Sequence, residues 1–332
     1  MQKKIILNIE TVYTANAFTA GGKNYVVGGS ETTPAVYLYD LGEGTSELVS
    51  DCPGGVMSFV PLPSTDNQFY SAMGLFPPFV GADAGIYRHV KTNGVWITEK
   101  VINLPFAHRC DILSRNGVNY LFAASCSKFK ENPADWSKDG EVYVARLDEN
   151  GLAEEPKLVF SLGRNHGMLK ADVNGEHTIF VSGADGIYYF DRNEGNWMAV
   201  KYFDKEVSEF GLIDMDGDGQ DELVTIEPFH GHMLNVYKRN GESWELQFTD
   251  ELAFGHGLSC GMFQGAPAIV VGNRRGSLTL VMYRPQDFAN GVVAKEVLEE
   301  ESGPTQTQIF TLNGTDYILS ANQLKKEVTL YY

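Results

Sequence analysis

A β-rich unit recurs along the chain, and this repetition constrains the fold more than any other sequence feature. Residues 166–175, HGMLKADVNG, and residues 256–265, HGLSCGMFQG, both place a histidine nine residues before a glycine. A β-rich run follows each, TIFVSG in one and AIVVGN in the other. Seven such units are visible, and equivalent positions in five of them lie at 108, 166, 208, 256 and 305, at intervals of 42 to 58 residues. This period is typical of four-stranded propeller blades.

The number of strands predicts how such a chain closes. An outer strand follows each of the first six units, whereas the seventh ends at Tyr332 after its third strand. Residues 3–9, KKIILNI, can supply the missing strand, because pairing the first and last segments leaves no open edge. The sequence therefore predicts an all-β, seven-bladed β-propeller of residues 1–332 as a single domain. A pair of β-sandwiches is the alternative, but it explains neither the period nor the missing strand.

Charge and composition narrow the classes of partner. The 43 acidic and 26 basic residues give a formal charge of −17, which repels phosphate backbones and anionic lipid surfaces. We therefore expect no nucleic-acid partner and no membrane partner. The apolar run near the N-terminus is too short for a signal peptide, which predicts a cytoplasmic protein. No CxxC spacing occurs, so free thiols are expected at Cys52, Cys110, Cys126 and Cys260.

Three histidines occupy the same position in their units, at the start of the innermost strand. In a propeller this position faces a common axis, so His108, His166 and His256 are expected to converge at the mouth of the central tunnel, open to water. Three neutral imidazoles with an open fourth position form catalytic zinc sites and also suit manganese or iron. The sequence therefore predicts a transition-metal site. A passive polar plug that holds water is the alternative.

Other candidate site residues lie near the same face, mainly in the loops between second and third strands. His230 and His232 are the first choice for a catalytic base, because a neutral imidazole titrates near the working pH. Glu209, beside the fourth tunnel position, is the second choice, and Arg274 is expected to hold developing negative charge. Cationic and aromatic side chains here suit a small anionic or keto sugar. The candidate substrate-binding residues are Arg275, Trp136, Phe76, Phe79 and Lys128.

Four further residues complete the histidine and cysteine inventory. Strand alternation turns Cys110 and Cys260 toward the tunnel, where they are either soft metal ligands or small fillers. We favour fillers, because an open zinc site needs only three protein ligands. His89 and His177 map to the opposite face.

Residues 214–222, DMDGDGQDE, place oxygen ligands at alternating positions. Such spacing surrounds a hard cation, as in an EF-hand loop, and the glycines permit the tight turn. We expect one structural calcium ion at this turn, on the face opposite the histidines. The expected ligands are Asp214, Asp216, Asp218, the backbone carbonyl of Gln220, and the carboxylate of Asp221 or Glu222.

The DxDGDGxDEL turn resembles the FG-GAP repeats of integrin-type seven-bladed propellers, and the HGxxxxDxNG units resemble bacterial VCBS repeats. The resemblance covers nearly the whole chain. Some propellers of this kind are metal-containing carbohydrate-active enzymes, among them aldos-2-ulose dehydratase and several polysaccharide lyases. The resemblance implies a metal-dependent lyase or dehydratase that removes a proton next to a carbonyl or carboxylate and then eliminates a β-substituent from an intracellular sugar derivative.

Two other functions stay open at this point. Reprotonation of the same enediolate would make the chain a sugar isomerase or epimerase. A non-catalytic propeller would instead bind a glycan or a protein, and it would hold calcium alone. Metal content after purification separates the non-catalytic propeller from the metal-dependent enzymes.

Overall fold

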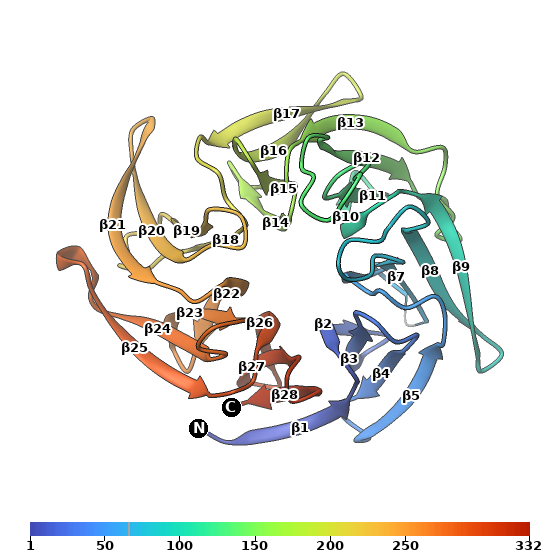
Figure 1. The fold of residues 1–332 in the computed structure, drawn as a ribbon, viewed down its shortest axis with the longest axis horizontal. Helices are drawn as coiled ribbons and strands as arrows, with labels where there is room; N and C mark the ends of the chain where they lie inside the picture. Colours follow the sequence, from blue (N-terminus) through green and yellow to red (C-terminus); the bar gives the residue numbers. More distant parts are fainter. Residues whose placement is uncertain (66) are drawn as a thin grey trace. The chain divides into compact units, whose positions relative to one another are not determined.

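The computed structural model describes residues 1–65 and 67–332, which form seven four-stranded antiparallel sheets (Figure 1). Six sheets contain four strands that are consecutive along the chain, and the seventh combines the first strand with the last three. This is the topology of a seven-bladed β-propeller, so the predicted fold class is confirmed. The chain divides into two compact units, which we call the four-blade unit (Ile9–Glu206) and the three-blade unit (Met1–Asn8 with Val207–Tyr332).

The four-blade unit contains four sheets, with strand orders β2-β3-β4-β5, β6-β7-β8-β9, β10-β11-β12-β13 and β14-β15-β16-β17. Their bounds are β2 Val12–Ala20, β3 Lys23–Ser30, β4 Val36–Asp40, β5 Thr45–Ser50, β6 Ser58–Pro61, β7 Gln68–Met73, β8 Gly85–Thr92, β9 Val95–Asn103, β10 Ala107–Arg115, β11 Val118–Ser125, β12 Gly140–Arg146, β13 Lys157–Leu162, β14 Gly167–Val173, β15 Glu176–Gly183, β16 Gly186–Asn193 and β17 Asn196–Phe203.

The three-blade unit contains the sheets β18-β19-β20-β21, β22-β23-β24-β25 and β26-β27-β28-β1. Their bounds are β18 Glu209–Ile213, β19 Glu222–Glu227, β20 Met233–Asn240, β21 Ser243–Glu251, β22 Gly255–Phe263, β23 Ala266–Asn273, β24 Leu280–Asp287, β25 Val292–Glu299, β26 Pro304–Leu312, β27 Thr315–Asn322, β28 Glu327–Tyr331 and β1 Lys3–Asn8. Among the described residues the only helix is the 3-10 turn η1, Phe288–Asn290. No helix in this part of the chain is long and apolar enough to cross a membrane.

The second and fourth strands of a blade differ in burial, and their sequences explain why. The second strand β7 is buried along its whole length, and β15 is buried from Thr178 onward, because apolar side chains pack on both faces of the sheet. The fourth strand β9 alternates between exposed and partly buried residues, as expected for a strand with one solvated face. The apolar core of each unit therefore lies around the second and third strands of its blades.

Asn-Gly pairs form tight turns between first and second strands, as the sequence indicates. Asn116 and Gly117 have φ angles of 52° and 75°, and Asn174 and Gly175 have 54° and 83°. Positive φ at both central residues matches the twist of a two-residue hairpin, and these two residue types tolerate it best. These turns set the length of the inner strands and so determine which residues begin them.

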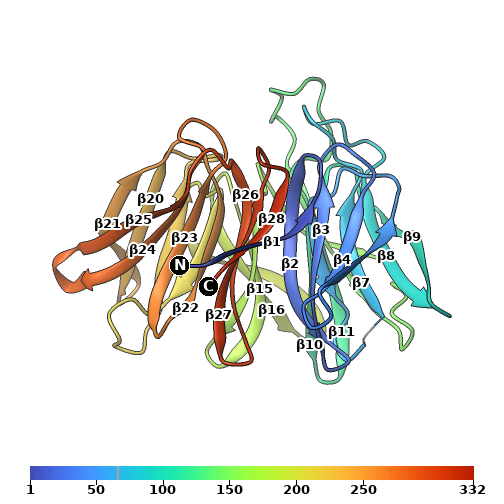
Figure 2. The same ribbon diagram turned by 90° about the horizontal axis from the view of Figure 1, so that it is seen from below.

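The first strand of the chain completes the last blade. Figures 1 and 2 show β1 beside β28, and the two strands pair antiparallel from Lys3 opposite Tyr331 to Asn8 opposite Glu327. Ile6 and Leu7 are buried in this sheet. The predicted closing strand is confirmed.

His89 lies inside its blade and not on an exposed face. The ring on β8 is fully buried and stacks on Phe69 at 4.6 Å between centroids. Its Nε2 and Nδ1 atoms hydrogen bond with the hydroxyls of Ser71 (2.8 Å) and Thr98 (2.9 Å). Burial lowers the pKa of His89 to about 3, so the ring is neutral at pH 7. His177, in contrast, is exposed and pairs with Asp172 at 2.5 Å.

Deleting residues 1–8 is expected to lower the free energy of unfolding by about 3 kcal/mol or more, because burial of Ile6 and Leu7 contributes about 1.5–3 kcal/mol each. The deletion also leaves β28 as an open edge, so the product should aggregate. Urea denaturation and size-exclusion chromatography measure both effects. The control is Ile5→Thr, on the half-exposed face of the same strand. An unchanged melting temperature of the deletion variant would contradict the closing role of β1.

Candidate functional site

The strand registers define one equivalent position in every blade, which we call the first position. In four blades it is the extra residue of a β-bulge in the first strand, and these residues are Tyr13, His108, His256 and Thr305. In the other three it directly precedes the strand, and its N–H donates to the second strand; these residues are Met57, His166 and Ser208. The structure thus places 108, 166, 208, 256 and 305 at equivalent positions, as expected, and adds 13 and 57.

Two of the first-position histidines lie together in the four-blade unit. The ring centroids of His108 and His166 are 4.4 Å apart, with 37° between the ring planes. The His108 Nε2 atom hydrogen bonds with the Tyr13 hydroxyl at 3.1 Å. Arg109 Nε donates to the His166 carbonyl oxygen at 3.2 Å, which fixes the backbone next to the second ring. The pair is therefore held by contacts from three different blades.

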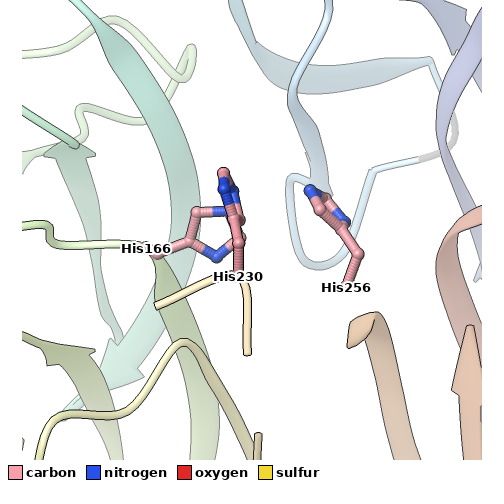
Figure 3. A group of neighbouring side chains, drawn as sticks. All are labelled: His166, His230 and His256. Carbon is pink, nitrogen blue, oxygen red and sulfur yellow. The ribbon is translucent and has the colours of Figure 1, made fainter. Parts of the chain in front are cut away.

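The third histidine, His256, pairs with a loop histidine in the three-blade unit. Its Nδ1 atom donates to the Thr305 carbonyl oxygen at 2.7 Å, so in the neutral ring the lone pair is on Nε2. The ring lies 5.4 Å from that of His230, with 25° between planes (Figure 3). A carbonyl acceptor that orients one nitrogen is typical of metal-ligating histidines. Figure 3 also draws His166, which belongs to the four-blade unit.

The structure corrects the expectation that the three histidines are open to water. His108, His166 and His256 expose only 3%, 2% and 1% of their surface. Truncation to alanine would therefore leave a buried cavity and destabilise the fold, contrary to the small cost expected for a solvated position. Substitution by glutamine, which retains volume and polarity, is the better test of a ligand role.

Of the two histidines proposed as a base, the structure brings His230 to His256. The His230 ring stacks on Phe229 at 4.0 Å and lies 4.9 Å from Phe254, and the backbone N–H of His230 donates to Ser208 Oγ at 3.2 Å. His232 is exposed to solvent. The ring contacts of His230 hold its side chain beside His256.

The remaining polar candidates of the three-blade unit have distinct surroundings. Arg275 is exposed, and its guanidinium lies 4.9 Å from the Phe254 ring centroid, so Arg275 and His230 contact the same ring. Arg274 donates from Nε and Nη2 to Gln323 Oε1, at 3.2 and 3.1 Å. Glu209 is buried at the start of β18, directly after Ser208. Arg275 is thus the better placed arginine for an anionic ligand.

The aromatic candidates of the four-blade unit form a cluster with Lys130, a cationic residue that the sequence places in the same loop as Trp136. Phe79 and Trp136 meet edge to face with centroids 5.1 Å apart. Lys130 Nζ lies 3.2 Å from the Trp136 centroid and 4.9 Å from that of Phe79, and burial lowers its pKa. Lys130 therefore covers one face of the Trp136 ring. Phe76 forms a bridge with Val80 next to this cluster.

Two cysteines and one lysine from the candidate set are accounted for by packing or pairing. Burial raises the pKa of Cys110 to about 12 and raises that of Cys260 as well, so both are neutral thiols at pH 7. This supports the interpretation of both as fillers. Lys128 is exposed and lies 3.7 Å from a Glu141 carboxylate oxygen. All four cysteines of the chain are free.

The acidic turn joins β18 to β19, as expected, and gathers its carboxylates. Asp214, Asp216 and Asp218 each offer an oxygen, and these oxygens lie within 4.8 Å of one another. Glu222 is fully buried; its Oε2 accepts from the Met215 N–H at 2.7 Å. Its Oε1 has no hydrogen-bond partner within the described residues and lies on the side of the turn occupied by Lys238. These residues fit a hard, oxygen-preferring cation.

Asn165 is a candidate functional residue that the sequence reasoning missed. It is 2% exposed, and neither polar atom of its carboxamide has a hydrogen-bond partner in residues 1–65 and 67–332. It directly precedes the first position of its blade. The six equivalent residues are apolar or small and all buried, namely Val12, Val56, Ala107, Val207, Gly255 and Pro304. Comparison of this position across the seven units would have revealed the exception.

Replacing Asn165 by valine is expected to raise the free energy of unfolding by about 1–2 kcal/mol, because it removes a buried amide without a partner. Urea denaturation measures this change. The control is Asn273→Val, since the buried Asn273 amide accepts from Ala253 N–H at 3.0 Å and donates to Thr279 Oγ1 at 3.1 Å. That variant should lose about 1–3 kcal/mol. If Asn165→Val is destabilising instead, the native amide is satisfied and is not a ligand-binding group.

Solved structures of other proteins share the fold across nearly the whole chain. The Swd1 β-propeller domain of Myceliophteria thermophila Cps50 covers 96% of this chain and 99% of its own, with a TM-score of 0.58 and 8% identity. A candidate 6-phosphogluconolactonase from Bacteroides uniformis covers 93% and 88%, with a TM-score of 0.55 and 12% identity. A chain of the mitotic checkpoint complex covers 95% and 94%, with a TM-score of 0.60 and 9% identity. No family model and no curated protein matches the sequence.

Proposed function

We propose that this chain is a metal-dependent carbohydrate lyase or dehydratase of the cytoplasm that acts on a small anionic or keto sugar. The observation that carries the proposal is the pairing of His256 with His230. The Thr305 carbonyl accepts from His256 Nδ1, so the neutral ring carries its lone pair on Nε2, the tautomer in which a histidine binds a metal through that atom. The fold neighbour described as a candidate 6-phosphogluconolactonase is compatible with a sugar-derived substrate on this fold.

The first-position histidines are the proposed ligands of a transition metal ion, zinc, manganese or iron. When bound, such an ion polarises a carbonyl or carboxylate oxygen of the substrate. His230 serves as the base that removes the neighbouring proton, because its ring is held by Phe229 and Phe254 and its backbone by Ser208. Arg275, which contacts the same Phe254 ring as His230, binds an anionic group of the substrate.

Loss of a β-hydroxyl after proton removal completes the elimination, and return of the proton from His230 would give isomerisation. The burial of His108, His166 and His256 favours a second candidate, a non-catalytic propeller in which the histidines form a polar plug. The two functions differ in whether the purified protein contains a transition metal.

Substitution of single histidines by glutamine tests the metal proposal. We expect the wild type to purify with zinc, manganese or iron, and His256→Gln, His166→Gln and His108→Gln each to lose it, if the three share one ion as the sequence predicts. His177→Gln should retain the full metal content, because His177 is exposed and pairs with Asp172. Elemental analysis and circular dichroism measure metal and fold.

Two outcomes would reject these assignments. A wild type that contains no transition metal, and takes up none from added zinc, manganese or iron, would establish the polar plug. A folded variant that keeps one full equivalent of metal would remove that histidine from the ligand set.

We also propose that residues 214–222 bind a structural calcium ion in the three-blade unit. The three aspartate oxygens and the buried Glu222 supply the acidic oxygen set that calcium prefers. Gln220, exposed in the same turn, adds its backbone carbonyl in the EF-hand-like pattern. Ligands drawn from one short turn stabilise the connection between β18 and β19.

Calcium is expected to raise the stability of the wild type, by about 2.7 kcal/mol at a hundredfold excess over the Kd. Asp216→Ala should abolish this dependence while leaving the transition metal in place. Melting temperatures with excess calcium chloride and with excess EGTA measure the effect. The control is Asp172→Ala, near the end of β14 and next to the corresponding turn of that blade, which should keep the full response to calcium. Equal responses of the wild type and Asp216→Ala would exclude this loop as the site.

A further inference from the structure

Lys238 extends its ammonium group into the acidic turn. Its Nζ atom lies 2.8 Å from Asp218 Oδ2, is in direct contact with Asp216 Oδ2, and lies 3.6 Å from Glu222 Oε1. These are three of the carboxylates expected to bind calcium. One lysine therefore neutralises part of the negative charge that a divalent cation would otherwise neutralise.

The sheet holds the backbone of Lys238 in place but leaves its side chain free to move. Lys238 follows Tyr237, which is buried and pairs with Leu223 across the β19–β20 ladder. The Lys238 side chain is 31% exposed and rotates about four carbon-chain bonds. On the other side of β20, Lys238 pairs in register with Glu245 of β21, whose carboxylate lies outside the acidic turn. The ammonium can thus leave the turn without any change in the fold.

An ammonium group and a calcium ion need the same carboxylate oxygens. Calcium takes six to eight oxygen ligands at about 2.3–2.6 Å, so Asp216 and Asp218 cannot serve it while they hold Lys238. The ordinary pKa of a lysine is about 10.4, so the ammonium that contacts Asp216 and Asp218 is charged at neutral pH.

We infer that Lys238 is an internal competitor of calcium that sets the calcium affinity of residues 214–222. This inference rests on the proposed calcium site. Without calcium, the ammonium compensates Asp216, Asp218 and the buried Glu222. With calcium, the ammonium leaves the turn, toward Glu245 or solvent. The turn thus remains ordered in both states, and the affinity is lower than its five oxygen donors alone would give.

Calcium titration of Lys238→Met by calorimetry tests the inference on the full chain. Methionine keeps the length of the side chain and removes the charge. We expect the Kd for calcium to fall at least roughly fivefold, the lower end of typical coupling between linked binding events. The matched control is Lys295→Met, which removes one positive charge from the same unit by breaking the pair of Lys295 with Asp250 at 2.5 Å. Its Kd should equal that of the wild type.

A second measurement follows the calcium-free protein. In excess EGTA, the melting temperature of Lys238→Met should lie below that of the wild type, because three carboxylates lose their counter-ion, and excess calcium should remove the difference. A variant with unchanged stability in EGTA would contradict compensation by the ammonium.

The outcomes separate the inference from the calcium proposal. Competition is supported if Lys238→Met binds calcium more tightly than both the wild type and Lys295→Met. It is also supported if Lys238→Met binds calcium and the wild type does not. Equal or weaker binding by Lys238→Met, with a wild type that binds calcium through Asp216, overturns the role of Lys238 and leaves the calcium site standing. If neither the wild type nor either lysine variant binds calcium, the site itself is wrong and the inference fails with it.

Discussion

The ladder between β1 and β28 is the interaction on which the rest of the three-blade unit depends. It joins residues near the two ends of the sequence and buries Leu7 beside Val328, its partner in the register. Without it, the last blade would end in a three-stranded sheet with an open edge.

β-Bulges at the inner strands explain how side chains from distant sequence positions form ordered polar groups. An extra residue in one strand leaves the ladder locally and turns its side chain away from the neighbouring pairs. Tyr13 and His108 both occupy such bulges, and they meet although 95 residues separate them. His256 and Thr305 do so in the three-blade unit. The bulges therefore bring together side chains from inner strands that are far apart in the sequence.

Periodicity, turn residues and edge pairing were sufficient to predict the fold, because each is a local or one-dimensional property. Asn-Gly pairs such as Asn174 and Gly175 mark the hairpins, and KKIILNI is the strand that the last blade lacks. Side-chain surroundings were not predictable in the same way. The burial of His89 against Ser71 and Thr98 depends on cross-strand contacts within one sheet, which the sequence alone did not resolve.

The candidate site shows the same limit. The equivalence of His108, His166 and His256 follows from sequence spacing, but their burial follows from packing between blades. Lys130 was expected among the cationic residues of this face, but its contact with the Trp136 ring was not. Lys238 was missed, because its role is recognised only through the contact of its ammonium with the Asp216 and Asp218 carboxylates. Asn165 was within reach, since a comparison of the residue before each first position needs only the seven units.

The two proposed metal sites differ in what holds their ligands, and this difference predicts what each ion does. The calcium ligands come from one turn of nine residues, in which the N–H groups of Gly217 and Gly219 already bind Asp214. An ion there orders a connection that the chain has largely formed by itself, and Lys238 can take over its charge. The histidines instead stand on separate inner strands, oriented by groups such as the Thr305 carbonyl that the ladders hold in place. Because strands and not a turn position these rings, an ion bound by them would supply reactivity to a framework that is already rigid. The proposed calcium ion would instead order a turn that takes no part in the reaction.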